Sequence, residues 1–277
     1  MLSNKLVLIL GCARSGTTLT FMVLTSHPSV TGKDEGEANF DFPTGRELLN
    51  NCLHRKFTCF KMPMATSRID AIQRRFRHVT IIYLMRHPYA VISSLKKLVL
   101  TKESATWLKV LNAEQLKRHT DFLNKLAMNV DGIRALRELA PRSFKEHARF
   151  CPEIDSIDLD NMDEVSVGAY LWKTKAMMIE KFQEAGIKVS VIRYEDLVED
   201  PRRILGPVLQ RMGISFDDRM LAHHEVHAGK NYCGGAVGSR PIDKTRIKPE
   251  LDLSADEMKT IDSICGAYVA QYAEQKV

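Results

Sequence analysis

Apolar and polar residues follow one another along the chain in blocks that predict strands, each followed by a helix. Residues 5–10 (KLVLIL) form a short run of strand-forming residues that ends at a glycine, which favours a buried parallel strand. The apolar spacing that follows is helical, so a helix is expected from Ser15 to about Thr25, shortly before Pro28. This opening stretch therefore predicts a strand, a turn and a helix.

The same order recurs twice further along the chain. Segment His78–Pro88 (HVTIIYLMRHP) has a β-branched apolar run, then an arginine and a proline suited to a helix start, followed by YAVISSLKKL. A third strand is expected within Ile187–Leu197, after a helical stretch that ends at Gly186. Strands that alternate with helices favour an α/β fold, with a central parallel sheet flanked by helices on both faces.

The remaining segments add helices and one basic stretch. Helical spacing without a convincing strand at about residues 102–165 predicts a helical insertion, suited to carrying substrate specificity, within a single domain of residues 1–277. Another helix is expected within residues 200–214, and a closing helix from about Ala255. Between them Gly229–Pro249 is rich in glycine and basic residues, a composition typical of a flexible loop over a charged ligand.

Composition narrows the class of protein. The 277 residues are 44% hydrophobic and 27% charged, as in an ordinary folded protein, and the formal charge of +6 comes without the Lys/Arg blocks of a nucleic-acid arm. The six cysteines have no C-x-x-C spacing, which favours free thiols in a reducing compartment. The apolar run Leu6–Leu10 is too short for a signal peptide or a membrane span, so we expect a cytoplasmic protein.

The turn after the first predicted strand has the chemistry of an anion site. Gly11 and Gly16 have the spacing of the phosphate-binding motif G-x-x-x-x-G-K-[ST], and the following helix would direct unpaired backbone N–H groups and a positive dipole toward a ligand. Thr17 stands where that motif has its lysine, and Thr18 adds a second hydroxyl. The missing lysine argues against ATP or GTP hydrolysis, because that lysine reaches the β- and γ-phosphates.

Three segments in order resemble the sulfotransferases that use 3'-phosphoadenylyl sulfate (PAPS): RSGTTL (Arg14–Leu19), RHPYAVISS (Arg86–Ser94) and VIRYEDLVEDP (Val191–Pro201). The resemblance implies a three-layer P-loop-like fold and a nucleotide-binding transferase. It places the 5'-phosphosulfate on Arg14, Ser15, Gly16, Thr17 and Thr18, the 3'-phosphate on Arg86, Ser94 and Lys248, and Tyr194 near the adenosine. Arg240, Lys244 and Arg246 are further candidates for the 3'-phosphate in the same basic stretch.

The motifs are most similar to those of protein-tyrosine and glycosaminoglycan sulfotransferases, which implies a glutamate general base. Glu35 and Glu37 both fit, and Asp34 stays open; the same run would also suit a solvated acidic turn. Lys61, within FKMP, matches a catalytic lysine of the family, and Ser239 matches a serine that contacts the transferring group. Fixed cations such as Arg14 and Lys61 would replace a metal in an in-line transfer to a hydroxyl of a small molecule, carbohydrate, lipid or peptide.

Two other functions share parts of this pattern. A P-loop kinase of small molecules would share the fold and the anion loop, and a non-catalytic nucleotide-binding protein would keep the loop without the base. The cluster His223, His224 and His227 resembles the H-E-x-x-H zinc motif, but the second histidine of that motif would be residue 228, which is Ala. We therefore expect no metal site there, and a surface helix with polar histidines instead.

Overall fold

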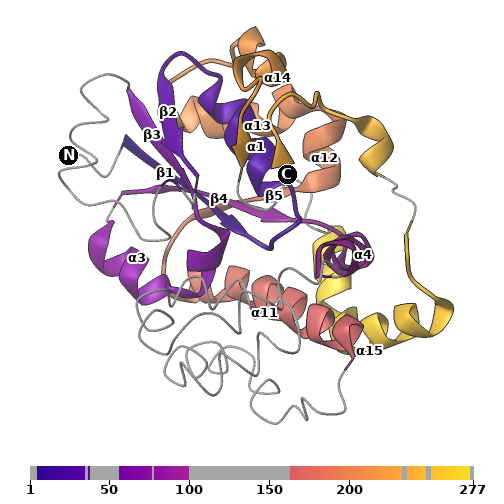
Figure 1. Ribbon diagram of the computed structural model, residues 1–277. Coiled ribbons are helices and arrows are strands. Elements are labelled where there is room, and N and C mark those ends of the chain that lie inside the picture. The colour runs from indigo at the N-terminus through magenta and orange to yellow at the C-terminus, as the bar shows by residue number, and fades with distance from the viewer. Residues whose placement is uncertain are drawn as a thin grey trace, which may run out of the picture. The chain divides into compact units, whose positions relative to one another are not determined.

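Five strands form a parallel sheet in the computed structural model of the chain. They are β1 (Leu6–Gly11), β2 (Val30–Lys33), β3 (Phe57–Lys61), β4 (Thr80–Met85) and β5 (Val189–Arg193), in the spatial order β2-β3-β1-β4-β5 (Figure 1). The structure describes residues 5–34, 37, 56–76, 78–99, 163–232, 236–247 and 251–274. The predicted helical insertion lies outside these residues, except at its end, where α11 begins at Glu164.

The central strand β1 is buried on both faces, as its unbroken apolar sequence predicts. All six of its residues are buried, and they pair with β3 on one side and with β4 on the other. The chain leaves β1 toward β2, whereas it leaves β4 toward β5. The connections of two neighbouring strands thus diverge, and the carboxyl ends of such strands are where open α/β sheets bind ligands.

Helices of the first compact unit cover the sheet (Figure 1). This unit draws on Met1–Arg86 and Lys181–Pro249. It contains α1 (Thr17–Thr25), α3 (Ile69–Arg75), α12 (Tyr194–Glu199), α13 (Pro201–Met212) and α14 (His223–Val226). Side chains of α1, α12 and α13 share one apolar core with β1, β3, β4 and β5, so a flanked parallel α/β sheet is confirmed.

The helix boundaries of this unit follow local backbone chemistry. Helix α13 begins at Pro201 and is capped by Asp200, whose side chain accepts a hydrogen bond from the backbone of Arg203 at 3.0 Å. It ends at Gly213, which adopts the left-handed conformation at φ 69°. Helix α1 begins at Thr17, two residues after the predicted start, because Gly16 at φ 84° is not helical.

Two predictions about the chain were incomplete or wrong. Strands β2 and β3 were not predicted, since β2 is only four residues long and contains a glycine, and β3 is a five-residue run that ends in Lys61. The surface helix expected around the three histidines is a short turn of helix, α14, and both His223 and His227 are buried, with 0% and 4% of their surface exposed. They therefore belong to the interior of the first unit.

The basic stretch after α14 contains ordered elements rather than only a loop. Strand β6 (Asn231–Tyr232) pairs with β7 (Ala236–Val237), and a short 3₁₀ helix, η4 (Lys244–Ile247), follows. Gly238 donates a backbone hydrogen bond to Lys230 at 2.9 Å. These contacts order the backbone that carries the basic residues of the segment.

The second compact unit draws on His87–Glu180 and Glu250–Lys276. Its described part holds α4 (Pro88–Val99), most of α11 (Glu164–Glu184) and α15 (Ala255–Glu274). Lys96 on α4 donates to Glu257 on α15 at 2.8 Å, and the hydroxyl of Tyr89 donates to Asp262 at 2.7 Å. The closing helix was predicted from Ala255, and it begins there.

Candidate active site

The first strand–helix corner, residues 12–16, is the foundation of the site. Gly11 lies so close to β4 that a Cβ there would be 2.1 Å from the carbonyl oxygen of Leu84, and Arg14 takes a left-handed conformation at φ 64°. No side chain caps α1 within the described part of the chain. The first backbone N–H groups of α1 and its dipole are thus available to an anion.

Ser15 adds a polar group to this corner. It is completely buried, and its hydroxyl oxygen has no hydrogen-bond partner among the residues that the structure describes. A buried hydroxyl without a partner is costly, and Ser15 is not among the residues that line the cavity described below.

Arg86, directly after β4, connects three parts of the site. Its guanidinium donates to the carbonyl oxygens of Arg14 at 3.4 Å and of Arg246 at 2.9 Å. It also lies over the ring of Tyr194, 4.3 Å from the ring centre, in a cation–π contact. Tyr194, the first residue of α12, is itself packed so closely on the corner that a Cβ at Gly16 would be 2.3 Å from its ring.

Three arginines concentrate positive charge at this corner. Burial, and then the charges of Arg86 and Arg246, lower the pKa of Arg14. Burial raises the pKa of Tyr194, while the charges of Arg86 and Arg246 lower it. Like charges held this close together mark a place where an anion would be strongly favoured.

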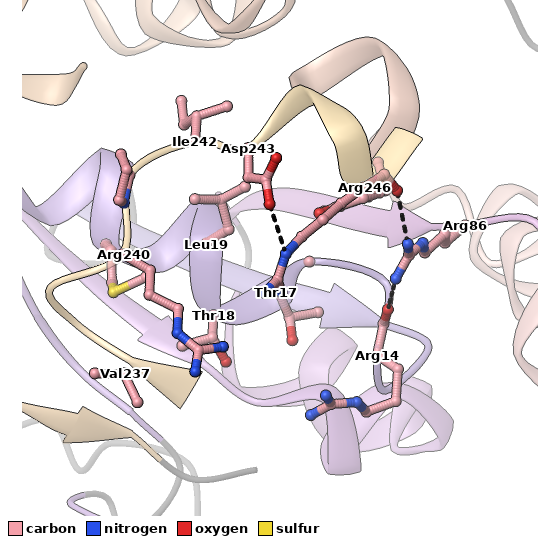
Figure 2. Close-up of a pocket in the computed structure, with 14 residues that line it drawn as sticks. Arg14, Thr17, Thr18, Leu19, Arg86, Val237, Arg240, Ile242, Asp243 and Arg246 are labelled. Carbon is pink, nitrogen blue, oxygen red and sulfur yellow. Dashed lines mark hydrogen bonds and ion pairs between the residues drawn. The ribbon is translucent and has the colours of Figure 1, made fainter. Parts of the chain in front are cut away.

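These groups border one cavity of about 340 Å³ (Figure 2). Arg14 and Arg86 lie on one side of it, and Leu19, Val237 and Ile242 lie on the other (Figure 2). The cavity is lined by Arg14, Gly16, Thr17, Thr18, Leu19, Met22, Arg86, Tyr194, Val237, Arg240, Pro241, Ile242, Asp243 and Arg246. Arg14 and Arg86 thus give one side a positive charge, and the other side combines apolar side chains with Arg240 (Figure 2).

Asp243 holds one of the cavity's arginines in place. Its carboxylate accepts a hydrogen bond from Nε of Arg246 at 3.3 Å (Figure 2). The hydroxyl and backbone of Thr245, and then Arg246, lower the pKa of Asp243. Asp243 therefore keeps its charge at neutral pH and orients Arg246 along the cavity wall.

Lys61 lies beside the anion loop. It is the last residue of β3, it is 1% exposed, and its ammonium donates to the hydroxyl of Thr18 at 3.1 Å. The carboxylate of Asp34, after β2, lies 3.8 Å from the same ammonium. Because β1, β2 and β3 run parallel, their carboxyl ends bring the anion loop, Asp34 and Lys61 to one edge of the sheet.

Asp34 is also tied to Glu37. The backbone of Asp34 donates to Oε2 of Glu37, and the backbone of Glu37 donates to Oδ1 of Asp34, each at 3.1 Å. Glu37 is exposed, whereas Asp34 is buried. The acidic run is thus a hydrogen-bonded turn with one carboxylate facing inward.

A buried histidine–tyrosine pair adjoins this cluster. Nε2 of His227 lies 3.1 Å from the carbonyl oxygen of Met22, to which it must donate, so Nδ1 accepts the hydrogen bond from the hydroxyl of Tyr232. Burial lowers the pKa of His227 to about 4, which keeps it neutral. Burial, and then the charges of Glu37 and Asp34, raise the pKa of Tyr232 to about 12.

The other residues predicted from the sequence have varied positions. Arg240 lines the cavity, whereas Lys244 faces Glu199 at 4.0 Å and is not among the lining residues. Ser239 is exposed and does not line the cavity either. Ser94 lies on α4 in the second unit and is half-buried. Glu35 and Lys248 lie outside the described residues.

Sequence reasoning missed two features of the site. Nothing in the sequence indicated that the His227–Tyr232 pair packs against α1, because the hydrogen bond that ties His227 to this helix joins it to Met22, 205 positions away in the chain. The apolar wall formed with Ile242 was also missed, although Leu19 lies within the motif that predicted the anion loop. Such contacts depend on how the segment after α14 folds back over α1.

The described residues contain neither a candidate metal centre nor a membrane-spanning helix. In the ranges that the structure covers, no three His, Cys, Asp or Glu side chains are grouped so that they could hold a metal ion. Within the same ranges, no helix combines the length and the apolar character that crossing a membrane requires.

Comparison with known proteins points to one family. The model of the sulfotransferase family matches residues 43–142, a range that includes Lys61, Arg86 and Ser94. Among curated protein sequences, none matches the chain significantly.

Solved structures share the fold along nearly the whole chain. The sulfotransferase domain of the Synechococcus PCC 7002 olefin synthase has a TM-score of 0.55 at 16% identity, over 98% of this chain and 95% of that one. A sulfotransferase from Alicyclobacillus acidocaldarius has a TM-score of 0.54 at 14% identity, over 98% and 96% of the two chains. The sulfotransferase domain of the curacin biosynthetic pathway has a TM-score of 0.54 at 16% identity, over 93% and 95%. The resemblance to the sulfotransferase family expected from the sequence is confirmed by the family model over residues 43–142 and by the fold of these structures.

Proposed function

We propose that the protein transfers the sulfuryl group of PAPS to the hydroxyl of an acceptor. The observation that carries this proposal is the group of three arginines, Arg14, Arg86 and Arg246, around the uncapped start of α1. An anion with charge at two separate points would match this distribution better than a single phosphate. PAPS has a phosphosulfate at its 5' carbon and a phosphate at its 3' carbon.

The residues of the cavity fit such a nucleotide. The N–H groups of α1 with Thr17 and Thr18, which line the cavity, suit the 5' end, and the family resemblance also assigns Ser15 to it. Arg86 and Arg246 suit the 3'-phosphate, because a guanidinium fork matches phosphate geometry. The apolar side chains on the far wall suit the adenine ring, and the family resemblance assigns Tyr194, which also lines the cavity, to the adenosine. From the family resemblance, we also assign Ser94 and Lys248 to the 3'-phosphate and Ser239 to the transferring group.

The donor supplies an activated sulfuryl group, and the protein supplies charge and a base. Lys61 and Arg14 would offset the negative charge that develops on the leaving oxygen, a preorganised electrostatic effect. A glutamate, Glu35 or Glu37, would take the proton of the acceptor hydroxyl. Glu37 is exposed beside the buried cluster, which suits a base that must meet an acceptor from solution.

A nucleotide-binding experiment tests the donor. The melting temperature is measured with 3'-phosphoadenosine 5'-phosphate (PAP), with AMP, which lacks the 3'-phosphate, and with ATP. PAP at ~100 times its dissociation constant should add about 2.7 kcal/mol of stability, or roughly 5–10 °C in a chain of this size. EDTA should leave the shift in melting temperature unchanged, because guanidinium groups would offset the phosphate charge that Mg²⁺ offsets in kinases. A shift with Mg·ATP and none with PAP would favour the kinase alternative.

A transfer experiment tests catalysis and the base. Radiolabelled PAPS is incubated with the protein and a panel of hydroxyl compounds: small molecules, carbohydrates, lipids and peptides. We expect labelled sulfate on at least one of these acceptor classes. Of the variants Glu35→Gln and Glu37→Gln, the one that removes the general base should lose sulfate transfer. PAP binding without transfer or sulfate release would instead support a non-catalytic nucleotide-binding protein.

A further inference from the structure

Asp34 lies between two groups of the proposed reaction centre. Its side chain is 6% exposed, and one carboxylate oxygen, Oδ2, is 3.8 Å from the ammonium of Lys61. The other oxygen, Oδ1, accepts the hydrogen bond from the backbone of Glu37 at 3.1 Å. One buried carboxylate thus contacts both the catalytic cation of the proposal and the segment that carries a candidate base.

We propose that Asp34 is a positioning residue for sulfuryl transfer, which holds Lys61 toward Thr18 and fixes the backbone at Glu37. This inference rests on the function proposed above. The sequence leaves Asp34 open as the base itself. Each of its two carboxylate oxygens contacts a group inside the protein. This favours a positioning role for Asp34 over the role of general base, which requires contact with the acceptor hydroxyl.

The contacts of Lys61 with Thr18 and with Asp34 differ in kind. The distance to the hydroxyl of Thr18, 3.1 Å, is that of a hydrogen bond, whereas 3.8 Å to Asp34 is too long for one. Asp34 therefore attracts the ammonium through its charge, whereas the hydrogen bond of the ammonium is directed at Thr18. The ammonium points at the first turn of α1, where the 5' end of the donor would lie.

Burial makes this charge pair important. Lys61 is 1% exposed, and a buried ammonium that loses a neighbouring carboxylate is strongly destabilised. Without Asp34 the lysine side chain would gain by moving away from Thr18 toward water or another acceptor. A shift of about 1 Å in a catalytic group can lower a rate about 100-fold.

A double-mutant cycle in stability tests the charge pair without any nucleotide. The unfolding midpoint is measured for the wild type, Asp34→Asn, Lys61→Met and the double variant. We expect Asp34→Asn to lower the midpoint by about 5 °C or more in the wild type, and by much less when Lys61 is already Met. If Asp34→Asn unfolds the protein and the double variant folds, the pair is supported. Equal losses in the two backgrounds would overturn the proposal.

The same cycle in rate tests the positioning role. Sulfate release from radiolabelled PAPS, to water or to an acceptor from the panel, is measured alongside PAP affinity. Asp34→Asn should lower the rate about 10- to 100-fold, with PAP affinity within about threefold of the wild type. In the Lys61→Met background it should change the remaining rate little. A loss of the same size in both backgrounds would show that Asp34 is the base and would overturn the positioning role.

A matched control and the wild type separate the outcomes. Asp256→Asn makes the same substitution in an exposed pair with Lys259, at 2.9 Å, and should change neither rate nor midpoint appreciably. If the wild type neither binds PAP nor releases sulfate, the proposed function fails, and the positioning role fails with it. If the wild type releases sulfate and Asp34→Asn does so at the same rate, only the positioning role fails.

Discussion

Replacing Arg86 by Met should lower both the free energy of unfolding and the affinity for PAP, and the two losses can be measured separately. Met keeps an unbranched apolar stem but removes the guanidinium, which donates to the carbonyl of Arg246 at 2.9 Å and lies 4.3 Å from the ring centre of Tyr194. The longer bond to the carbonyl of Arg14, 3.4 Å, would also be lost.

The stability cost follows from these contacts. A hydrogen bond from a charged donor contributes about 1.5–3 kcal/mol, and a desolvated cation–π contact contributes about 2 kcal/mol. Relief of the repulsion with Arg14 offsets part of this sum. We therefore expect a net loss of about 2–3 kcal/mol, or roughly 4–12 °C in melting temperature.

The binding cost is larger. Removing one partner of a buried charged pair costs about 2–5 kcal/mol, so PAP affinity should fall about 100-fold. At ~100 times the wild-type dissociation constant, the stabilisation by PAP would then shrink from about 2.7 to about 0.4 kcal/mol. AMP, without a 3'-phosphate, should bind the two proteins equally.

Urea titrations with and without PAP and AMP measure both quantities. The matched control is Arg202→Met, because Arg202 lies over the ring of Phe216 at 4.6 Å on an exposed surface. Full PAP stabilisation of the Arg86→Met protein would refute the assignment of Arg86 to the 3'-phosphate. A comparable drop in AMP binding would show that Arg86 serves the 5' end instead.

Three further variants or conditions test the rest of the site. Gly16→Ala should abolish most PAP stabilisation and cost about 1–3 kcal/mol, because Gly16 has φ 84° and its Cβ would lie 2.3 Å from the ring of Tyr194; Gly206→Ala, with no atom within 4 Å, is the control. Glu37→Gln should retain PAP binding, measured by calorimetry, and lose sulfate transfer at least 100-fold if Glu37 is the base; unchanged transfer would leave Glu35. The free energy of unfolding should decrease as the pH falls, because burial lowers the pKa of His227 to about 4 in the folded protein. The unfolded chain takes up a proton on this residue near pH 6.5, whereas the folded protein does so only near pH 4. Between pH 7.5 and 5 this loss is about 2 kcal/mol, and urea titrations of His227→Asn should show a correspondingly smaller decrease.

The sequence predicted those parts of the fold whose signal is local. Strands β1, β4 and β5 are apolar runs followed by recognisable helix starts, so their positions and the corners at Arg14 and Arg86 could be predicted. Strands β2 and β3 are short, and glycine or lysine interrupts their pattern. Their pairing with β1 is a long-range property that no local pattern carries.

The site shows the same division. The sequence offered four basic residues between Arg240 and Lys248 for one phosphate and could not choose among them. The structure orients Arg246 through Asp243 and through the bond from Arg86 to its carbonyl. Both Arg240 and Arg246 line the cavity, and which basic side chains do so depends on how the segment folds against the corner after β4, which residue type alone does not determine.

The clustering of Arg14, Arg86 and Arg246 has a practical consequence for handling the protein. Mutual repulsion among three guanidinium groups is relieved by any small dianion that settles among them, so phosphate and sulfate buffers should compete with the nucleotide. Apparent affinities measured in such buffers would be weaker than those in chloride of equal ionic strength. Crystals grown from ammonium sulfate would be expected to show a sulfate at the start of α1.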